Sequence, residues 1–177
     1  MTIRSAFQFC PRCSKKLNWP ARRHFAACIS CRYELYDQPK IVVTGLLMDD
    51  AHRVLLNRRA AEPHKGKWGT LGGFVEIGET AEAALRREIK EELHTRLGKL
   101  RYVVSVPGTY PYQGVATPYL EIAFAGRGPD LRKVRIDRKE ISALRYFTLK
   151  DIPFGRLAFR SQNITLQALR DGALRNL

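Results

Sequence analysis

The segment from Thr80 to Leu93 restricts the fold of this chain more than any other part of the sequence. Thr80 is a residue type that caps helix N-termini, and the residues after it are mostly strong helix formers. Leu85, Ile89 and Leu93 recur every four residues, which gives one apolar stripe along the helix. The segment is therefore predicted to be a helix that packs this stripe on a core.

Three carboxylates lie beside the apolar stripe. Glu88, Glu91 and Glu92 span about 100° of arc, because a helix turns by about 100° per residue. Glu88 and Glu92 form a like-charge pair that destabilises a bare helix by roughly a few tenths of a kcal/mol. Hard oxygen ligands of this kind suit Mg²⁺ or Mn²⁺. The alternative is a solvated acidic face that neighbouring Arg and Lys side chains neutralise.

The helix and the glycine-rich loop before it resemble the Nudix box. That pattern is Gly, five residues, Glu, seven residues, then Arg-Glu-apolar-any-Glu-Glu. The residues at the matching positions are Gly73, Glu79, Arg87, Glu88, Ile89, Glu91 and Glu92. The context of strand, loop and helix also agrees with the pattern. The resemblance implies an enzyme that hydrolyses phosphoanhydride bonds.

The resemblance also implies a role for each residue of the box. The carboxylates that would hold catalytic Mg²⁺ or Mn²⁺ are Glu88, Glu91 and Glu92. Arg87 and Glu79 would form a pair that fixes the helix to the loop, and the Gly73 carbonyl would add a metal ligand. The metals would bridge a diphosphate and lower the pKa of a water that attacks phosphorus in line.

The end of the box departs from the pattern. His94 stands in place of the closing glycine, and Thr95 in place of an apolar residue. The glycine ends the helix in a left-handed turn. Histidine is enriched among non-glycine residues with positive φ, so His94 could serve in the same way. The alternative is an altered or longer helix that ends at Gly98.

All four cysteines fall in two CxxC pairs, at Cys10, Cys13, Cys28 and Cys31. This spacing predicts a zinc ribbon with one tetrahedral structural Zn²⁺. A redox dithiol is the weaker alternative, because it would not need two matching pairs. Basic residues and one aromatic in the ribbon also leave nucleic-acid binding open; they are Lys15, Lys16, Arg22, Arg23 and Trp19.

A zinc ribbon directly before a Nudix-like domain resembles the NADH pyrophosphatase group and the related FAD and ADP-ribose pyrophosphatases. This resemblance implies that Phe74 stacks on a base of a dinucleotide, whereas a residue that plugs the core is equally compatible. It implies that Glu140 is an extra metal ligand, although an ordinary surface glutamate would look the same. Glu121 is the rival ligand, since a charge in mid-strand would be costly if unpaired.

Two later segments bear on the substrate. The NADH enzymes carry Ser-Gln-Pro-Trp-Pro-Phe-Pro after the box, and residues 105–111 here keep the Ser and some prolines but not the Gln or Trp. NADH itself is therefore not the predicted preferred substrate. Residues 157–161 resemble a closing motif of the zinc-ribbon relatives, or else form a core-packing turn before the last helix.

The predicted fold class is an α/β/α sandwich with a mixed sheet, preceded by a small zinc-ribbon module. Residues 1–36 would form the ribbon, and residues 37–177 the Nudix domain. Strands are predicted at 41–48, 54–59, 100–106, 119–125 and 144–149, and helices at 80–93 and 161–174. Ser161 is a candidate N-cap of the last helix. The segments 60–73 and 107–118 are predicted to be loops.

The chain has 31 basic and 17 acidic residues, a formal net charge of +14, which favours polyanionic partners. No membrane span or export signal is recognised, so a cytoplasmic protein is expected. The predicted function is hydrolysis of a nucleoside diphosphate linked to another group, of the NAD(H), ADP-ribose or FAD type. The alternatives are an RNA 5′-cap hydrolase and a nucleic-acid-binding zinc-ribbon protein with a vestigial Nudix domain. A homodimer is implied only by the resemblance.

Overall fold

The computed structural model describes residues 2–21 and 24–171, apart from the side chain of Tyr112. The chain separates into two compact units. The smaller comprises Met1–Lys40 and Gly108–Tyr119, and the larger comprises Ile41–Pro107 and Leu120–Leu177. The predicted division at residue 36 followed chain order alone, whereas the smaller unit also takes in a stretch of later sequence.

The smaller unit is built on a three-stranded antiparallel sheet with the order β1-β2-β3. Its elements are the four-residue helix α1 (Ile3–Ala6) and the strands β1 (Leu17–Asn18), β2 (Phe25–Cys28) and β3 (Glu34–Tyr36). Its buried apolar core consists of Cys10, Leu17, Ala26 and Cys28. A core this small stabilises little by itself.

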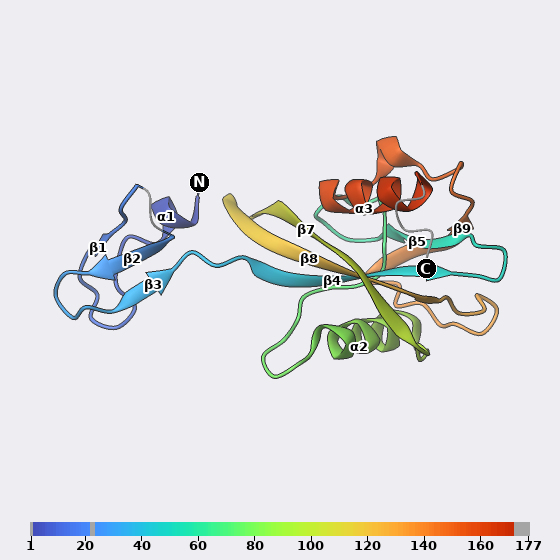
Figure 1. Ribbon diagram of the computed structural model, residues 1–177, viewed down its shortest axis with the longest axis horizontal. Helices are drawn as coiled ribbons and strands as arrows, with labels where there is room; N and C mark the ends of the chain where they lie inside the picture. The colour runs from blue at the N-terminus through green and yellow to red at the C-terminus, as the bar shows by residue number, and fades with distance from the viewer. Residues whose placement is uncertain (1, 22–23, 172–177) are drawn as a thin grey trace. The chain divides into compact units, whose positions relative to one another are not determined.

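The larger unit is a sheet covered by one helix on each face (Figure 1). The strands follow the order β6-β5-β4-β8-β7, and β9 pairs with β5. Figure 1 shows β4 and its neighbour β8 running in the same direction, while β5 is antiparallel to β4, so the sheet is mixed. The strands are β4 (Lys40–Met48), β5 (Val54–Arg59), β6 (Trp68–Gly69), β7 (Leu100–Tyr112), β8 (Val115–Arg127) and β9 (Ile141–Phe147). The stretch Gly108–Tyr119, where β7 and β8 meet, belongs to the smaller unit. The helices are α2 (Ala81–Leu93), α3 (Arg160–Arg170) and the 3₁₀ turn η1 (Phe154–Arg156). The predicted α/β/α sandwich is confirmed.

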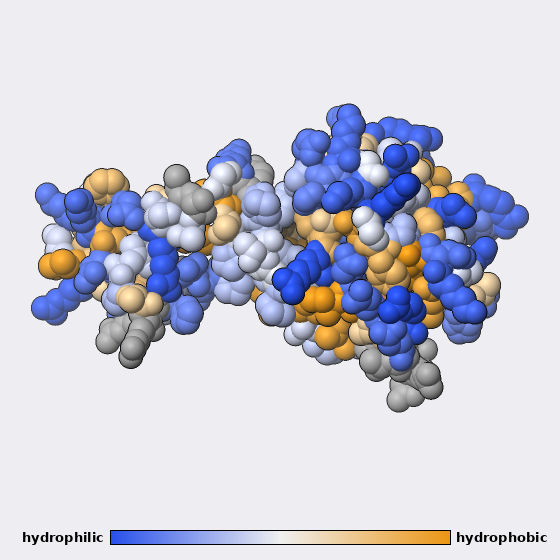
Figure 2. All heavy atoms as spheres, turned by 90° about the horizontal axis from the view of Figure 1, so that it is seen from above, coloured by the Kyte–Doolittle hydropathy of each residue, from blue (hydrophilic) through white to orange (hydrophobic). Residues whose placement is uncertain are grey.

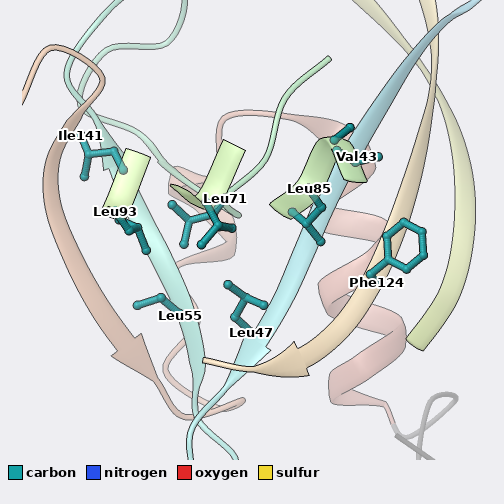
Figure 3. Packing of buried hydrophobic residues seen from close by; sticks show 10 residues of the cluster. Val43, Leu47, Leu55, Leu71, Leu85, Leu93, Phe124 and Ile141 are labelled. Carbon is teal, nitrogen blue, oxygen red and sulfur yellow. The ribbon is translucent and has the colours of Figure 1, made fainter. Parts of the chain in front are cut away.

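The apolar stripe of α2 packs on one face of the sheet, as the sequence predicts. Leu85, Ile89 and Leu93 are fully buried. Figure 3 shows Leu85 and Leu93 pointing toward strand residues such as Leu47 and Leu55. This packing fixes the rotation of α2 about its axis, and so decides where its carboxylates lie.

The opposite face of the sheet packs against α3. Leu46 on β4 and Leu56 on β5 point to this side and pack with Leu166 and Leu169 of the helix. Since β4 is buried on both faces, it reads as a continuous apolar run. On the side of the larger unit that carries α3, seen in Figure 2, hydrophilic side chains cover much of the surface and apolar ones show between them. None of the helices in the described ranges is long and apolar enough to cross a membrane.

The predicted loop at 107–118 is wrong, because β7 and β8 continue through it as one long hairpin. The strands meet at Gln113 and Gly114, whose φ values of 48° and 79° suit a two-residue hairpin turn. Pro107 and Pro111 suggested a loop, yet both lie in β7, which is at the edge of the sheet. Proline is tolerated there because an edge strand does not need every N–H.

The predicted cap at Ser161 is also wrong. The helix begins one residue earlier, and its N-cap Phe159 makes no side-chain capping bond. The Ser161 hydroxyl instead donates to Glu121 on β8 over 2.9 Å, and Thr165 donates to the same carboxylate over 3.4 Å. The predicted end of this helix at residue 174 lies outside the described residues. Glu121, the rival metal ligand, therefore faces α3 rather than α2.

The Glu121 contacts generate a prediction about stability and pH. Glu121 is 2% exposed, and burial raises its pKa to about 7, although the Ser161 and Thr165 hydroxyls oppose that shift. Ionisation therefore costs more in the folded than in the unfolded chain. The stability associated with the protonated carboxyl is complete below about pH 4.5 and is lost as pH rises through about 7.

We compare how the free energy of unfolding changes between about pH 5 and about pH 8 in the wild type and in Glu121→Gln. Over this range the wild type should lose about 2.5 kcal/mol more than the variant. Urea unfolding at both pH values measures this difference. Glu62→Gln, at an exposed loop position, is the control and should follow the wild type. If the free energy of unfolding of the wild type and of Glu121→Gln changed with pH in the same way, the raised pKa of Glu121 would be contradicted.

Candidate metal centre

Arg87 ties the loop before α2 to the helix itself. Its Nε donates to Glu79 Oε1 over 2.8 Å and its Nη2 to Glu79 Oε2 over 3.1 Å, a two-point fork. Nη2 also donates to the Phe74 carbonyl over 2.9 Å. The pKa of Glu79 lies below its ordinary value because Arg87 hydrogen-bonds its carboxylate. The structure thus brings together the pair that the resemblance predicted.

The same guanidinium also contacts two of the predicted metal ligands. Arg87 Nη1 lies 2.9 Å from Glu88 Oε1 and 3.1 Å from Glu91 Oε2. Arg87 therefore neutralises part of the acidic face, as the alternative to a metal site supposed. It does not pair with every carboxylate, since its ion pairs with glutamates are to Glu79, Glu88 and Glu91.

Glu92 does not form an ion pair with Arg87. It is 6% exposed, and its Oε2 is buried without a hydrogen-bond partner. Burial, followed by repulsion from Glu88 and Glu140, raises the pKa of Glu92 well above its ordinary value. Arg59 and the Gly72 N–H oppose that rise without cancelling it. An orphaned carboxylate oxygen in this setting fits a divalent cation.

Glu88 and Glu140 share this electrostatic environment. Burial raises the pKa of Glu88 although Arg87 opposes the shift, and repulsion from Glu91 and Glu140 adds to the rise. Glu140 is exposed, and its charge contributes to the raised pKa of both Glu88 and Glu92. Glu91 is more peripheral, with 59% of its side chain exposed.

Gly73 is positioned by the strand next to it and by Glu88. Its carbonyl accepts the Val43 N–H over 2.8 Å, and a carbonyl oxygen keeps a second lone pair for another partner. A Cβ at position 73 would overlap the Glu88 carboxylate. The absence of a side chain therefore lets Glu88 lie directly against the loop backbone.

The left-handed helix end is built with His94. Its φ of 51° and ψ of 37° are left-handed, and its N–H donates to the Lys90 carbonyl. The helix ends at Leu93, so the longer helix to Gly98 is wrong.

Phe74 is 45% exposed, which excludes its alternative role as a core plug. Stacking of Phe74 on a base stays a prediction.

The four cysteines of the smaller unit converge on one point. Their sulfur atoms all lie within 4.8 Å of one another, and among the described residues only these ligands draw together so closely. The Cys31 N–H lowers the pKa of Cys28 to about 6. Against the opposing effect of the Lys15 N–H, the hydrogen bond to the Cys31 side chain raises the pKa of Cys13 to about 12. Among the described residues, no three carboxylates of the larger unit come together within that distance.

Trp19 and the basic residues of the ribbon were predicted as a surface for nucleic acid. The Trp19 indole N–H donates to the Phe7 carbonyl over 2.7 Å, and the Arg4 guanidinium lies 5.8 Å from the ring centroid. One face of this ring is therefore already covered. Arg22 and Arg23 lie outside the described residues.

The sequence analysis did not single out two residues of this site. Gly72 donates its N–H to Glu92, and Asp137 orders the turn that carries Glu140. The signal for Asp137 was available, because an Asp whose side chain accepts the N–H two residues on is typical of a turn. Only the folded chain shows that this turn lies beside α2.

The family of the chain follows from comparison with known proteins. The family model described as the NUDIX domain matches residues 38–168, most of the chain. The chain belongs to the Nudix family. The matched range contains the whole carboxylate cluster, so the positions assigned to the Nudix box lie within a Nudix domain.

Similar proteins include curated relatives and a solved structure. The NAD-capped RNA hydrolase NudC of Haemophilus influenzae is 36% identical over 108 residues, which are 59% of this chain and 40% of the relative. NudC of Klebsiella pneumoniae is 29% identical over 147 residues, 82% of this chain and 53% of the relative. The chain thus spans about half or less of the length of these relatives. A Nudix hydrolase structure from Nitrosomonas europaea matches 93% of this chain and 91% of its own, with a TM-score of 0.65 and 25% identity.

The Arg87 fork of the Nudix domain generates a test of the loop-to-helix tie. Arg87→Lys keeps the charge but loses the planar two-point contact with Glu79 and the Phe74 carbonyl. We expect the free energy of unfolding to fall by about 2 kcal/mol. Thermal and urea unfolding measure this loss.

Arg101→Lys, at an exposed position on β7, is the matched control and should change the free energy by less than about 0.5 kcal/mol. An equal effect at both positions would mean that the Arg87 fork contributes nothing specific.

Proposed function

We propose that this chain is a divalent-metal-dependent pyrophosphohydrolase that cleaves a nucleoside diphosphate linked to another group. The observation that carries the proposal is the buried, unpartnered Oε2 of Glu92 beside Glu88 and Glu140. Membership of the Nudix family supports it. Similarity to relatives that are named NAD-capped RNA hydrolases supports it too, although this chain spans only part of their length.

Mg²⁺ or Mn²⁺ fits the donor set of the cluster. The residues that would hold the cation are Glu88, Glu91, Glu92 and Glu140, with the Gly73 carbonyl as a further oxygen ligand. When bound, the cation supplies charge neutralisation for the diphosphate and acidifies a bound water. Relief of the repulsion among the carboxylates would favour binding.

The residues of the chain orient the reaction. Glu79 and Arg87 hold the loop with Gly73 and Phe74 against the helix, so that substrate and carboxylates keep one geometry. A water oxygen forms a new bond to one phosphorus atom, and the bridging P–O bond breaks. The released phosphate takes the bond electrons and the water proton passes to solvent or to a carboxylate. The products are two monophosphates, and no oxidant or second substrate is needed.

Three features support the proposed substrate class. Two relatives are named as NAD-capped RNA hydrolases, which favours a dinucleotide of the NAD type. Phe74 is 45% exposed, and stacking of its ring on a base is part of the proposal. The altered segment 105–111 argues against free NADH as the preferred substrate. FAD and ADP-ribose have the same diphosphate and remain within the proposal.

A second candidate is hydrolysis of a nucleotide cap at the 5′ end of RNA. The net charge of +14 favours a polyanionic substrate over a small dinucleotide. Comparison of the rate with capped RNA and with free NAD separates the two candidates.

The cysteine cluster is proposed to hold one structural Zn²⁺. Four sulfur atoms within 4.8 Å of one another match a closed tetrahedral site, which leaves no open position for catalysis. A cytoplasmic location and a homodimer stay predictions from the sequence.

The central test replaces Glu92 by Gln, which keeps the shape of the side chain and removes its charge. Purified protein with Mg²⁺ or Mn²⁺ is offered NADH, NAD, FAD, ADP-ribose, diadenosine polyphosphates and nucleoside triphosphates. We expect turnover of at least one diphosphate-linked nucleotide and a loss of about a hundredfold or more in Glu92→Gln.

Glu82→Gln is the matched control, because Glu82 lies in the first turn of the same helix and is exposed. It should retain activity. No turnover of any substrate by the wild type, with RNA retained at physiological salt, would instead support the nucleic-acid-binding alternative.

A further inference from the structure

The segment that carries Glu140 is attached to the C-terminal end of α2. The last carbonyls of a helix lack partners within the helix itself. Here the Arg135 N–H donates to the Leu93 carbonyl over 3.2 Å, and the Asp137 N–H donates to the Glu92 carbonyl over 2.8 Å. The backbone of one metal-ligand candidate, Glu92, is therefore bonded directly to this segment.

His94 adds a third bond at the same place. Its Nδ1 lies 3.0 Å from the Arg135 carbonyl oxygen, and since a carbonyl only accepts, Nδ1 carries the hydrogen. Arg135 is thus held at both backbone groups, by Leu93 and by His94. His94 makes this bond from the left-handed conformation that ends the helix.

Asp137 connects the segment at Arg135 to Glu140 through hydrogen bonds. Its side chain accepts the Lys139 N–H over 2.9 Å, and its carbonyl accepts the N–H groups of Glu140 and Ile141 over 3.2 and 2.9 Å. The Glu140 carbonyl in turn accepts the Ala60 N–H over 2.8 Å. A short, ordered turn therefore links the bond at Arg135 to the carboxylate at position 140.

We propose that His94 is a positioning residue, which holds the Glu140 carboxylate at the metal centre through its hydrogen bond to the Arg135 carbonyl. The Nudix box has glycine at this position, and glycine would end the helix in the same way but could not make this bond. The histidine thus does two things at once: it ends α2 and orders the loop that supplies an extra ligand. This inference rests on the proposed function, because it assumes that Glu140 binds the cation.

The test uses two substitutions that both keep the left-handed helix end. His94→Gly restores the residue of the family pattern and removes the bond. His94→Asn also tolerates the left-handed conformation, and its amide nitrogen stands as many bonds from the backbone as Nδ1. Mn²⁺ binding is measured by electron paramagnetic resonance on protein whose cysteine cluster is loaded with zinc.

We expect His94→Gly to weaken Mn²⁺ binding by about three- to fivefold, the factor that one exposed hydrogen bond is worth. His94→Asn should stay within about twofold of the wild type, since it keeps the donor. The midpoint of thermal unfolding should not fall in either variant. Hydrogen exchange at residues 135–141 should speed up in His94→Gly alone.

A double-mutant cycle decides whether His94 acts through Glu140. In a Glu140→Gln background the further change His94→Gly should leave Mn²⁺ affinity unchanged, because the ligand it positions is gone. An equal loss in both backgrounds would overturn the inference, as would unaltered Mn²⁺ binding by His94→Gly. A fall in the unfolding midpoint that accounts for the weaker binding would also overturn it.

Failure of the proposed function gives a different result. If Glu92→Gln binds Mn²⁺ as the wild type does, then the metal centre itself is wrongly assigned. If Glu92→Gln loses Mn²⁺ and His94→Gly does not, then only the role of His94 is wrong.

Discussion

The proposed metal centre depends on one carboxylate, Glu92, which is buried with too little positive charge near it. Glu92 is held against the core by the Leu85–Leu93 stripe of α2, so it cannot turn away to solvent. Glu88 and Glu140 add negative charge beside it, and one oxygen of Glu92 has no hydrogen-bond partner. The proposed divalent cation would meet all three conditions, because it would neutralise the charges and bind the oxygen that lacks a partner.

The rest of the larger unit keeps this cluster in place. Arg87 donates hydrogen bonds to Glu79, Glu88 and Glu91 and also to the backbone of the loop, so one guanidinium couples the loop to the helix. Its ion pairs with glutamates do not include Glu92. At the other end of α2, the carbonyls of the last turn and His94 attach the segment that brings in Glu140. Both ends of the helix therefore contribute a loop to the site.

Much of this could be predicted from local sequence. Helix α2, its cap at Thr80, the pairing of Arg87 with Glu79 and the cysteine cluster all follow from short-range spacing, and the structure contains each of them. The β7–β8 hairpin was missed because prolines and a glycine read as a loop, whereas an edge strand accommodates them. The predicted cap at Ser161 is wrong because its hydroxyl donates to Glu121, a partner forty residues away that only tertiary packing brings near. The role of His94 depends on the same kind of long-range contact, with Arg135.

The position of a bound cation tests the account most directly. Crystals grown or soaked with Mn²⁺, and measured at a wavelength where manganese scatters anomalously, locate the ion without reference to activity. The account predicts an anomalous peak in contact with carboxylate oxygens of Glu88 and Glu92, with Glu140 turned toward it. A peak elsewhere, or none at millimolar Mn²⁺ with an empty, unaltered cluster, would contradict the claim that these carboxylates form a metal centre.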